Sequence, residues 1–224
     1  MLLYFLALMA ILPVAAIRAA RNLDAGKPLP PKTRYLLLSM LTQVFLAALA
    51  VLVAGRVGIR LWNLPRLGTG VVLGGVVFFA VLTITIPLRW RRAQETQRKR
   101  LRLIVPEHPR EYPLWIALAL TAGIGEELVW RGVLFSLVAR YTGSVAIAAA
   151  LSALHFGICH IVQGWRSVAL IAAIGLVAQA MTISAGSLFP AMLLHFLYDA
   201  VAGIWFQQLD RVSALPAAAV RSDA

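Results

Sequence analysis

Long apolar runs separated by short polar breaks are the dominant pattern of this 224-residue chain. A helix that crosses a membrane needs about 20 mostly apolar residues, with a range of about 17–25. Seven runs approach or reach that length, at residues 2–17, 35–55, 67–88, 111–141, 144–162, 166–183 and 186–206. The pattern therefore predicts an all-α fold, a polytopic transmembrane helical bundle of about seven spans (six to eight).

The breaks between the runs are basic. The longest, residues 89–110, holds eight Lys or Arg residues together with Pro106 and Pro109. Apolar side chains such as Trp90 and Leu101 make part of it amphipathic, so it either lies on an anionic membrane surface or forms a solvated loop. With the N-terminus outside, sixteen basic residues fall on the inner side and four on the outer side. This asymmetry favours that orientation, because cytoplasmic loops carry the excess of Lys and Arg.

Composition supports a membrane protein and excludes a nucleic-acid-binding one. Hydrophobic residues make up 61% of the chain and charged residues 13%, whereas soluble domains have about 45–50% and about 25%. The net charge of +12 comes from residues spread between apolar runs rather than from a basic patch on a soluble fold. The single cysteine, Cys159, excludes an internal disulfide.

No internal repeat divides the chain, so we expect one helical membrane domain with three parts. Residues 1–111 are expected to form the N-terminal helices and the basic loop, residues 112–206 the functional core, and residues 207–224 a flexible tail. Four glycines in the third run predict close helix packing there, since small residues let helix backbones approach. They are Gly68, Gly70, Gly74 and Gly75.

A few polar side chains are predicted at membrane depth. They are Glu126, Glu127, Arg131, His155, His160, His195 and Asp199. A charged group there costs about 3 kcal/mol or more, which makes it a functional-site hypothesis by default. Residues four apart share a helix face, as do Glu127 with Arg131 and His195 with Asp199. Three helices that each contribute polar groups predict one shared cavity.

Each of these groups also has a structural interpretation. Glu127 and Arg131 form an ion pair that offsets burial, His160 is a hydrogen-bonded core histidine, and His195 pairs with Asp199 between helices. His155 faces away from His160 because five residues separate them, so we expect it to serve packing. Glu126 has no partner at helical spacing, which makes it the strongest candidate for chemistry.

The residue types suit hydrolysis. A glutamate in an apolar run beside a second carboxylate is a candidate general base. One histidine is suited to holding water, and a second to donating a hydrogen bond to an oxyanion, a contribution often worth about 3–4 kcal/mol. Glu126, His160 and His195 also suit zinc or another divalent ion. The His-Glu-x-x-His spacing of zinc proteases is absent.

Three motifs in order resemble the CAAX protease and bacteriocin-processing family, also called the abortive-infection family, which includes type II CAAX prenyl endopeptidases. They are E-E-x-x-x-R at Glu126, Glu127 and Arg131, F-x-x-x-H at Phe156 and His160, and H-x-x-x-D at His195 and Asp199. The flanking sequences EELVWRGVLF and GSLFPAMLLH are similar too. The resemblance covers about residues 111–206, and the N-terminal half is similar only as membrane helices.

The resemblance implies an intramembrane endopeptidase. By analogy, Glu126 activates water with the help of His160, while Glu127 is held by Arg131 and shapes the site. His195 and residue 199 would stabilise the oxyanion. Asp199 stands where the eukaryotic-type enzymes have asparagine, although bacterial relatives use aspartate. An ionised Asp199 would repel an oxyanion, so its role is either a protonated donor or the orientation of His195.

We therefore predict a CAAX-prenyl-protease-like endopeptidase in a multi-pass membrane location, the bacterial plasma membrane. The glutamate mechanism requires no cofactor, and a zinc-dependent version is the alternative. The expected partners are membrane lipid and a peptide or protein substrate that enters from the membrane; the sequence predicts no oligomeric state. A non-enzymatic immunity or scaffold protein is the second hypothesis. A proton-coupled transporter ranks lowest, since no repeat or pair of broken helices is visible.

Overall fold

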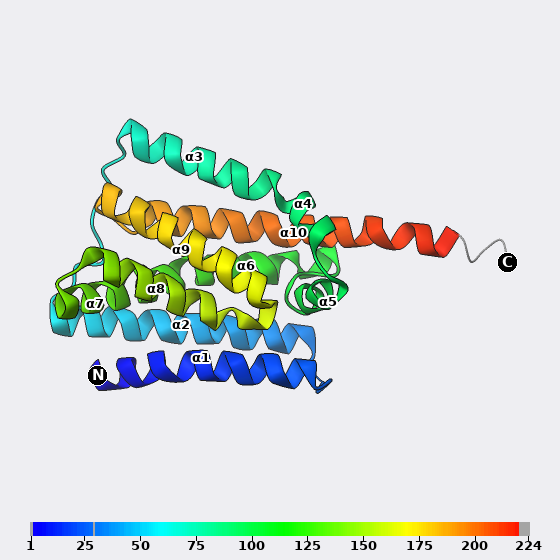
Figure 1. The fold of residues 1–224 in the computed structure, drawn as a ribbon, viewed down its shortest axis with the longest axis horizontal. Helices are drawn as coiled ribbons and strands as arrows, with labels where there is room; N and C mark the ends of the chain where they lie inside the picture. Colours follow the sequence, from blue (N-terminus) through cyan, green and yellow to red (C-terminus); the bar gives the residue numbers. More distant parts are fainter. Residues whose placement is uncertain (1, 29, 220–224) are drawn as a thin grey trace.

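The fold is a bundle of roughly parallel and antiparallel helices, seen in a computed structural model that describes residues 2–28 and 30–219 (Figure 1). The helices are α1 (Leu2–Asp24), α2 (Lys32–Val57), α3 (Thr69–Ile84), α4 (Ile86–Arg92), α5 (Glu95–Ile104), η1 (Pro109–Glu111), α6 (Tyr112–Glu126), η2 (Glu127–Leu134), α7 (Phe135–Thr142), α8 (Val145–Cys159), η3 (Ile161–Gln163), α9 (Trp165–Ala185) and α10 (Phe189–Ala219). The described residues contain no β-strand. The predicted all-α bundle is confirmed.

Within residues 2–28 and 30–219, six helical segments are long and apolar enough to cross a membrane. They are Phe5–Asp24, Lys32–Val57, Thr69–Arg92, Pro109–Thr142, Trp165–Ala185 and Phe189–Val212. The fifth predicted run is the exception, because its helix α8 has 15 residues and a full span needs about 20. The chain still passes from end to end of the bundle there, so α1 begins at one end and α10 finishes at the other (Figure 1).

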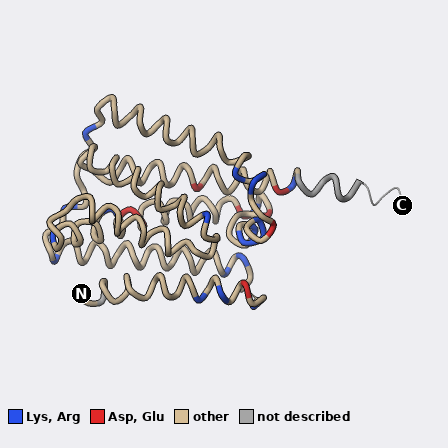
Figure 2. Tube along the Cα trace, viewed as in Figure 1, with Lys and Arg blue, Asp and Glu red and all other residues tan. Residues whose placement is uncertain are grey.

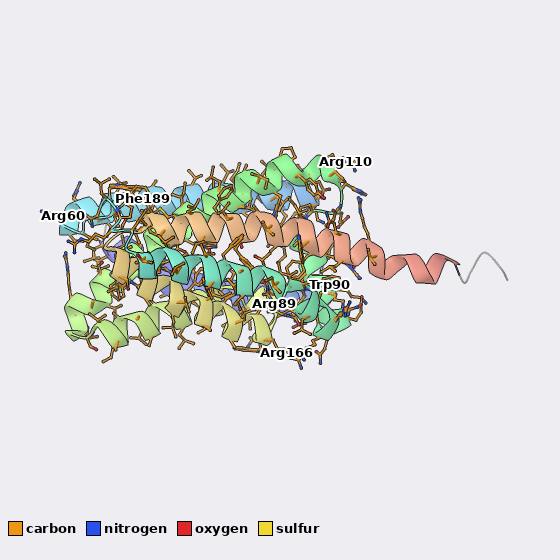
Figure 3. The ribbon with its side chains drawn as sticks, turned by 90° about the horizontal axis from the view of Figure 1, so that it is seen from above. Arg60, Arg89, Trp90, Arg110, Arg166 and Phe189 are labelled. Carbon is orange, nitrogen blue, oxygen red and sulfur yellow. The ribbon has the colours of Figure 1, made fainter. Side chains whose placement is uncertain are left out.

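The two ends of the bundle differ in charge. Figure 2 shows most Lys and Arg residues at the end where α4 and α5 lie, and a smaller group at the opposite end. Figure 3 places Arg89, Arg110 and Arg166 at the first end and Arg60 at the other. We call the first of these the basic end. An excess of Lys and Arg is typical of cytoplasmic loops.

The basic segment 89–110 is neither a loose loop nor a helix free on the membrane surface. Most of it forms α4 and α5, which close the basic end of the bundle (Figure 1). Ion pairs tie it to three other helices. They are Arg100–Asp24 on α1, Lys32–Glu107 from α2 at 2.5 Å, and Arg102–Asp210 on α10 at 2.7 Å. These contacts hold α5 across the bundle.

Helix α10 continues beyond residue 206, where the tail was predicted to begin. Gln207 accepts a hydrogen bond from the Tyr112 hydroxyl at 2.5 Å and donates one to the Glu107 carbonyl at 2.9 Å. Together with the Arg102–Asp210 pair, these bonds fix the helix on the basic end. The remainder of the predicted tail, residues 220–224, lies outside the described residues.

The largest cluster of buried apolar side chains surrounds η2. Buried side chains of η2, including Trp130 and Val133, pack against Phe5 of α1, Leu46 of α2 and Phe156 of α8. The N-terminal helices therefore share one core with the segment 112–206.

The prediction of close packing at the glycines of the third run is wrong for three of the four. A Cβ at Gly68, Gly70 or Gly74 would meet nothing within 4 Å, whereas one at Gly75 would lie 3.3 Å from Leu194. Helix α3 lies at the periphery of the bundle (Figure 1), so most of its small residues face away from other helices. The closest approaches at glycines lie elsewhere, at Gly123 and Gly125 of α6, Gly132 of η2, Gly157 of α8 and Gly203 of α10.

Candidate active site

The two adjacent glutamates lie where the helix changes its winding. Glu126 is the last residue of α6 and Glu127 the first of η2, a π-helix of eight residues. Both are buried, with 6% and 1% of their surface exposed. Short π-helical segments are rare and occur frequently at functional sites. The i to i+5 hydrogen bonds keep backbone groups paired within the helix, as membrane depth requires.

Two glycines bring neighbouring helices close to these glutamates. A Cβ at Gly125 would lie 2.9 Å from the Gln43 carbonyl oxygen of α2. One at Gly123 would lie 2.9 Å from the Phe196 nitrogen of α10. Any larger residue would therefore push α2 or α10 away. The glycines allow side chains from both helices to reach the carboxylates of α6 and η2.

Glu127 is held on two sides. Its Oε1 lies 3.1 Å from Nη1 of Arg131 and accepts a hydrogen bond from Nδ1 of His195 at 2.8 Å. Arg131 is itself buried, and its guanidinium lies over the Phe156 ring, 4.1 Å from the centroid. A cation over an aromatic face is attracted by the ring quadrupole. Arg131, Phe156 and Glu127 thus form the support that orients His195.

Glu126 has a different environment. Its Oε1 accepts a hydrogen bond from Nε2 of Gln43 at 2.6 Å. Its Oε2 is buried without a hydrogen-bond partner among the described residues. That oxygen lies 3.8 Å from Nε2 of His160 and 3.7 Å from Nε2 of His195. The structure therefore brings together one carboxylate oxygen and two imidazole nitrogens from three helical segments.

Hydrogen bonding defines which nitrogen of each imidazole faces Glu126. Nδ1 of His160 lies 2.8 Å from the Phe156 carbonyl oxygen, which only accepts, so this nitrogen carries the proton and donates. Nδ1 of His195 donates in the same way to the Glu127 carboxylate. Each ring is thus fixed by its Nδ1, and each Nε2 is directed toward Oε2 of Glu126.

Asp199 lies beside His195 at the edge of the cluster. Its Oδ2 is 3.5 Å from Nε2 of His195, and 31% of its side chain is exposed. The Asp199 backbone carbonyl accepts a hydrogen bond from the Trp115 indole at 3.0 Å. Five predicted site residues therefore meet in one place, on α6, η2, the end of α8 and α10.

His155 is not part of this cluster. Its Nδ1 accepts a hydrogen bond from the Trp130 indole at 2.8 Å, and its Nε2 donates to the Met9 carbonyl at 2.7 Å. Both ring nitrogens are therefore used inside the bundle. The structure agrees with the expected packing role, which rested on the five-residue offset from His160.

A cavity of about 210 Å³ runs from the cluster toward the basic end. Its inner wall includes His160, His195 and Asp199, and its walls are mostly apolar residues of α3, α9 and α10. Glu126 is not among the lining residues, whereas its neighbours Glu127, Arg131, His160 and His195 are. At a rise of 1.5 Å per residue, Glu126 lies about 20 Å along the helix that begins at Tyr112. The cavity thus connects a deep site with the basic end.

Two functional candidates were missing from the sequence analysis. Gln43 bonds Glu126, and Arg89 lines the cavity, where it donates to the Tyr198 hydroxyl at 3.0 Å and the Leu82 carbonyl at 2.6 Å. Figure 3 shows Arg89 next to Trp90 toward the basic end. The sequence could have indicated Gln43, because its amide is polar and lies in an otherwise apolar run. Nothing in the sequence distinguishes Arg89 from the other basic residues of the segment 89–110.

The described residues contain no group of three His, Cys, Asp or Glu side chains arranged to hold a metal ion. Glu126, His160 and His195 come nearest to such a set, with donor atoms 3.7 and 3.8 Å from the carboxylate oxygen.

Comparison with known proteins gives one match. Residues 108–201 match the family described as Rce1-like, Type II CAAX prenyl endopeptidase, and this segment contains all three motifs. The match confirms, for residues 108–201, the resemblance to the CAAX protease and bacteriocin-processing family that the sequence motifs indicate. The match supports a CAAX-protease-like endopeptidase. The six apolar helices of the described residues indicate an integral multi-pass membrane protein. The chain matches no curated protein and no solved structure.

Proposed function

We propose that this protein is an intramembrane endopeptidase that uses water activated by Glu126 and His160. The observation that carries the proposal is the position of Oε2 of Glu126. This oxygen makes no hydrogen bond among the described residues and lies within 4 Å of two imidazole nitrogens. A general base needs a free acceptor close to the proton it removes, and apo geometry is often looser than the reacting complex.

Water would enter between the two imidazoles from the cavity. Nε2 of His160, unprotonated in the tautomer set by Phe156, accepts a hydrogen bond from the water. Oε2 of Glu126 takes a proton as the water oxygen bonds to the carbonyl carbon of the substrate. The same proton then passes to the leaving nitrogen as the C–N bond breaks. Gln43 holds the other carboxylate oxygen and so fixes the direction of the base.

His195 is suited to stabilising the oxyanion that forms on the carbonyl oxygen. Glu127 holds its Nδ1, so a protonated Nε2 can donate toward the cavity. Removing such a donor costs about 10²–10³ in rate in a well-studied protease. Asp199, 3.5 Å from Nε2 of His195, favours this protonated ring. We therefore assign Asp199 to orienting His195 rather than to contacting the oxyanion.

The cavity suits a substrate that enters from the membrane. Its walls are mainly apolar, with Arg89 and Gln97 as polar residues near the basic end. We propose that a peptide or protein segment reaches the site along this route, and that the membrane is the bacterial plasma membrane. The mechanism as proposed uses only groups of the chain and water. Zinc dependence is the alternative, and loss of activity on chelation that added zinc restores would favour it.

The test is peptide cleavage by the purified full chain in proteoliposomes. We expect Glu126→Gln to lower kcat by about 10²–10⁴-fold, the usual contribution of general acid–base catalysis. The matched control is Glu95→Gln, which removes an exposed carboxylate paired with Arg102 at 2.9 Å. Surface pairs of this kind contribute about 0–1 kcal/mol to stability, so the control should cleave normally. Equal activity of wild type and Glu126→Gln would contradict the proposal.

A further inference from the structure

A second hollow lies at the basic end, away from the candidate active site. It has a volume of about 590 Å³ and lies between the last turns of α1 and the first turn of α9, with α5 and η3 alongside. The side chains that matter here are Arg21, Asp24, Arg100, Trp165 and Arg166. The hollow is separate from the catalytic cavity, with Gln97 of α5 as the residue that lines both.

The charge of this hollow is unbalanced. Three arginines line it against one aspartate, Asp24, which is paired with Arg100. Arg100 also lies 3.4 Å from the carbonyl oxygens of Ile161 and Val162, so its guanidinium is committed to holding α5 on α1 and η3. Arg21 and Arg166 are exposed, and within the described part of the chain their side chains make no hydrogen bond or ion pair. Two positive charges are therefore available to a ligand.

The position of the hollow matches the headgroup level of a membrane. Arg21 lies near the end of the spanning segment Phe5–Asp24, and Trp165 begins the spanning segment Trp165–Ala185. Trp165 is 71% exposed. Trp and Arg at the ends of spanning helices are typical of the membrane–water interface. Ile17 and Ala20 line the side of the hollow nearer the membrane interior, next to where acyl chains would lie.

We propose that this hollow binds the phosphate of an anionic phospholipid headgroup. Basic pockets between membrane helices on the cytoplasmic side bind anionic lipid headgroups, and each Lys or Arg near the surface contributes about 1 kcal/mol. Arg21 and Arg166 supply the charge, and Arg100 fixes the helices that carry them. The bound lipid would bridge α1 and α9, both of which line the hollow. This site does not depend on the proposed catalytic activity.

The test measures lipid binding by the full chain purified in a neutral detergent. The thermal unfolding midpoint is followed while phosphatidylglycerol, phosphatidylcholine or inorganic phosphate is added. We expect a saturable rise with phosphatidylglycerol only. In the double variant Arg21→Gln/Arg166→Gln, the concentration for half saturation should rise about 25-fold, about fivefold for each charge removed. Both residues are exposed, so these changes should leave the fold intact.

The matched control is Arg91→Gln/Arg92→Gln, which removes the same charge from exposed positions of the basic end outside the hollow. Its half-saturation concentration should equal that of wild type. An equal loss in both double variants would show attraction by net charge alone and overturn the site. Unchanged affinity in Arg21→Gln/Arg166→Gln would overturn it as well. Equally strong, arginine-dependent binding of inorganic phosphate would assign the hollow to a free anion and not to lipid.

Discussion

Two polar clusters lie inside the same bundle and differ in how their atoms are used. In one, the Trp130 indole donates to His155, His155 donates to the Met9 carbonyl, and Ser152 donates to the Trp130 carbonyl at 2.6 Å. In the other, His160 and His195 each use one ring nitrogen and direct the second toward Glu126. The first cluster is closed by bonds within the chain, and the second keeps polar atoms available to a reactant.

The difference explains why polar groups at similar depth have separate roles. Buried polar groups without partners are costly, by about 1–3 kcal/mol each. A closed cluster avoids this cost and joins α1, η2 and α8. The open cluster retains this cost at Oε2 of Glu126 and at Oε2 of Glu127. Substitutions in the closed cluster should therefore change stability alone, whereas those in the open cluster should change rate.

A substitution of Arg131 tests the ion pair with Glu127 that orients His195 in the open cluster. It should give the largest change in the free energy of unfolding. We expect Arg131→Met to lower the free energy of unfolding by about 3–5 kcal/mol, because Glu127 keeps its charge in a site with 1% exposure. Denaturant titration in mixed micelles measures this. The exposed Arg92→Met is the control. Adding Glu127→Gln to Arg131→Met should recover part of the loss; full stability of Arg131→Met alone would show that the ion pair is not the support.

His160 tests the open cluster itself. In His160→Asn the amide can still donate to the Phe156 carbonyl, while the nitrogen that faces Glu126 is lost. We expect kcat to fall about 10²-fold, at the lower end for an acid–base group, with an unchanged unfolding midpoint. His108→Asn, in the exposed basic segment, is the matched control. A lowered unfolding midpoint with a normal kcat would contradict this prediction and show that His160 serves stability, as the closed cluster does.

The sequence predicted much of the open cluster because its members recur at helical spacing. Four-residue offsets placed Glu127 with Arg131 and His195 with Asp199, and the five-residue offset separated His155 from His160. The site assignments remain predictions of role, although the structure brings the residues together. Gln43 escaped notice because a lone amide in α2 has no spacing partner, and its approach to Glu126 depends on the contact between Gly125 and α2.

Other features depend on tertiary packing and leave little trace in the pattern. The π-helix Glu127–Leu134 could not be predicted, because its sequence ELVWRGVL would equally suit a regular α-helix. The early end of α8 follows from the turn through His160 and Gly164, whose φ of 96° suits glycine. The basic segment needed the ion pairs to α1, α2 and α10 before its place across the bundle could be known.

Trp130 tests the closed cluster and should give the smallest effect. Trp130→Phe removes the indole N–H and leaves Nδ1 of His155 with only the weak contact to Sγ of Cys159 at 3.8 Å. We expect a loss of about 1 kcal/mol in the free energy of unfolding, the usual net value of one hydrogen bond, and an unchanged kcat. The pair of measurements separates the clusters, since His160→Asn should show the opposite pattern. A 10²-fold fall in kcat for Trp130→Phe would mean that the two clusters act as one unit, because Trp130 also lies against the Phe156 ring at 5.3 Å.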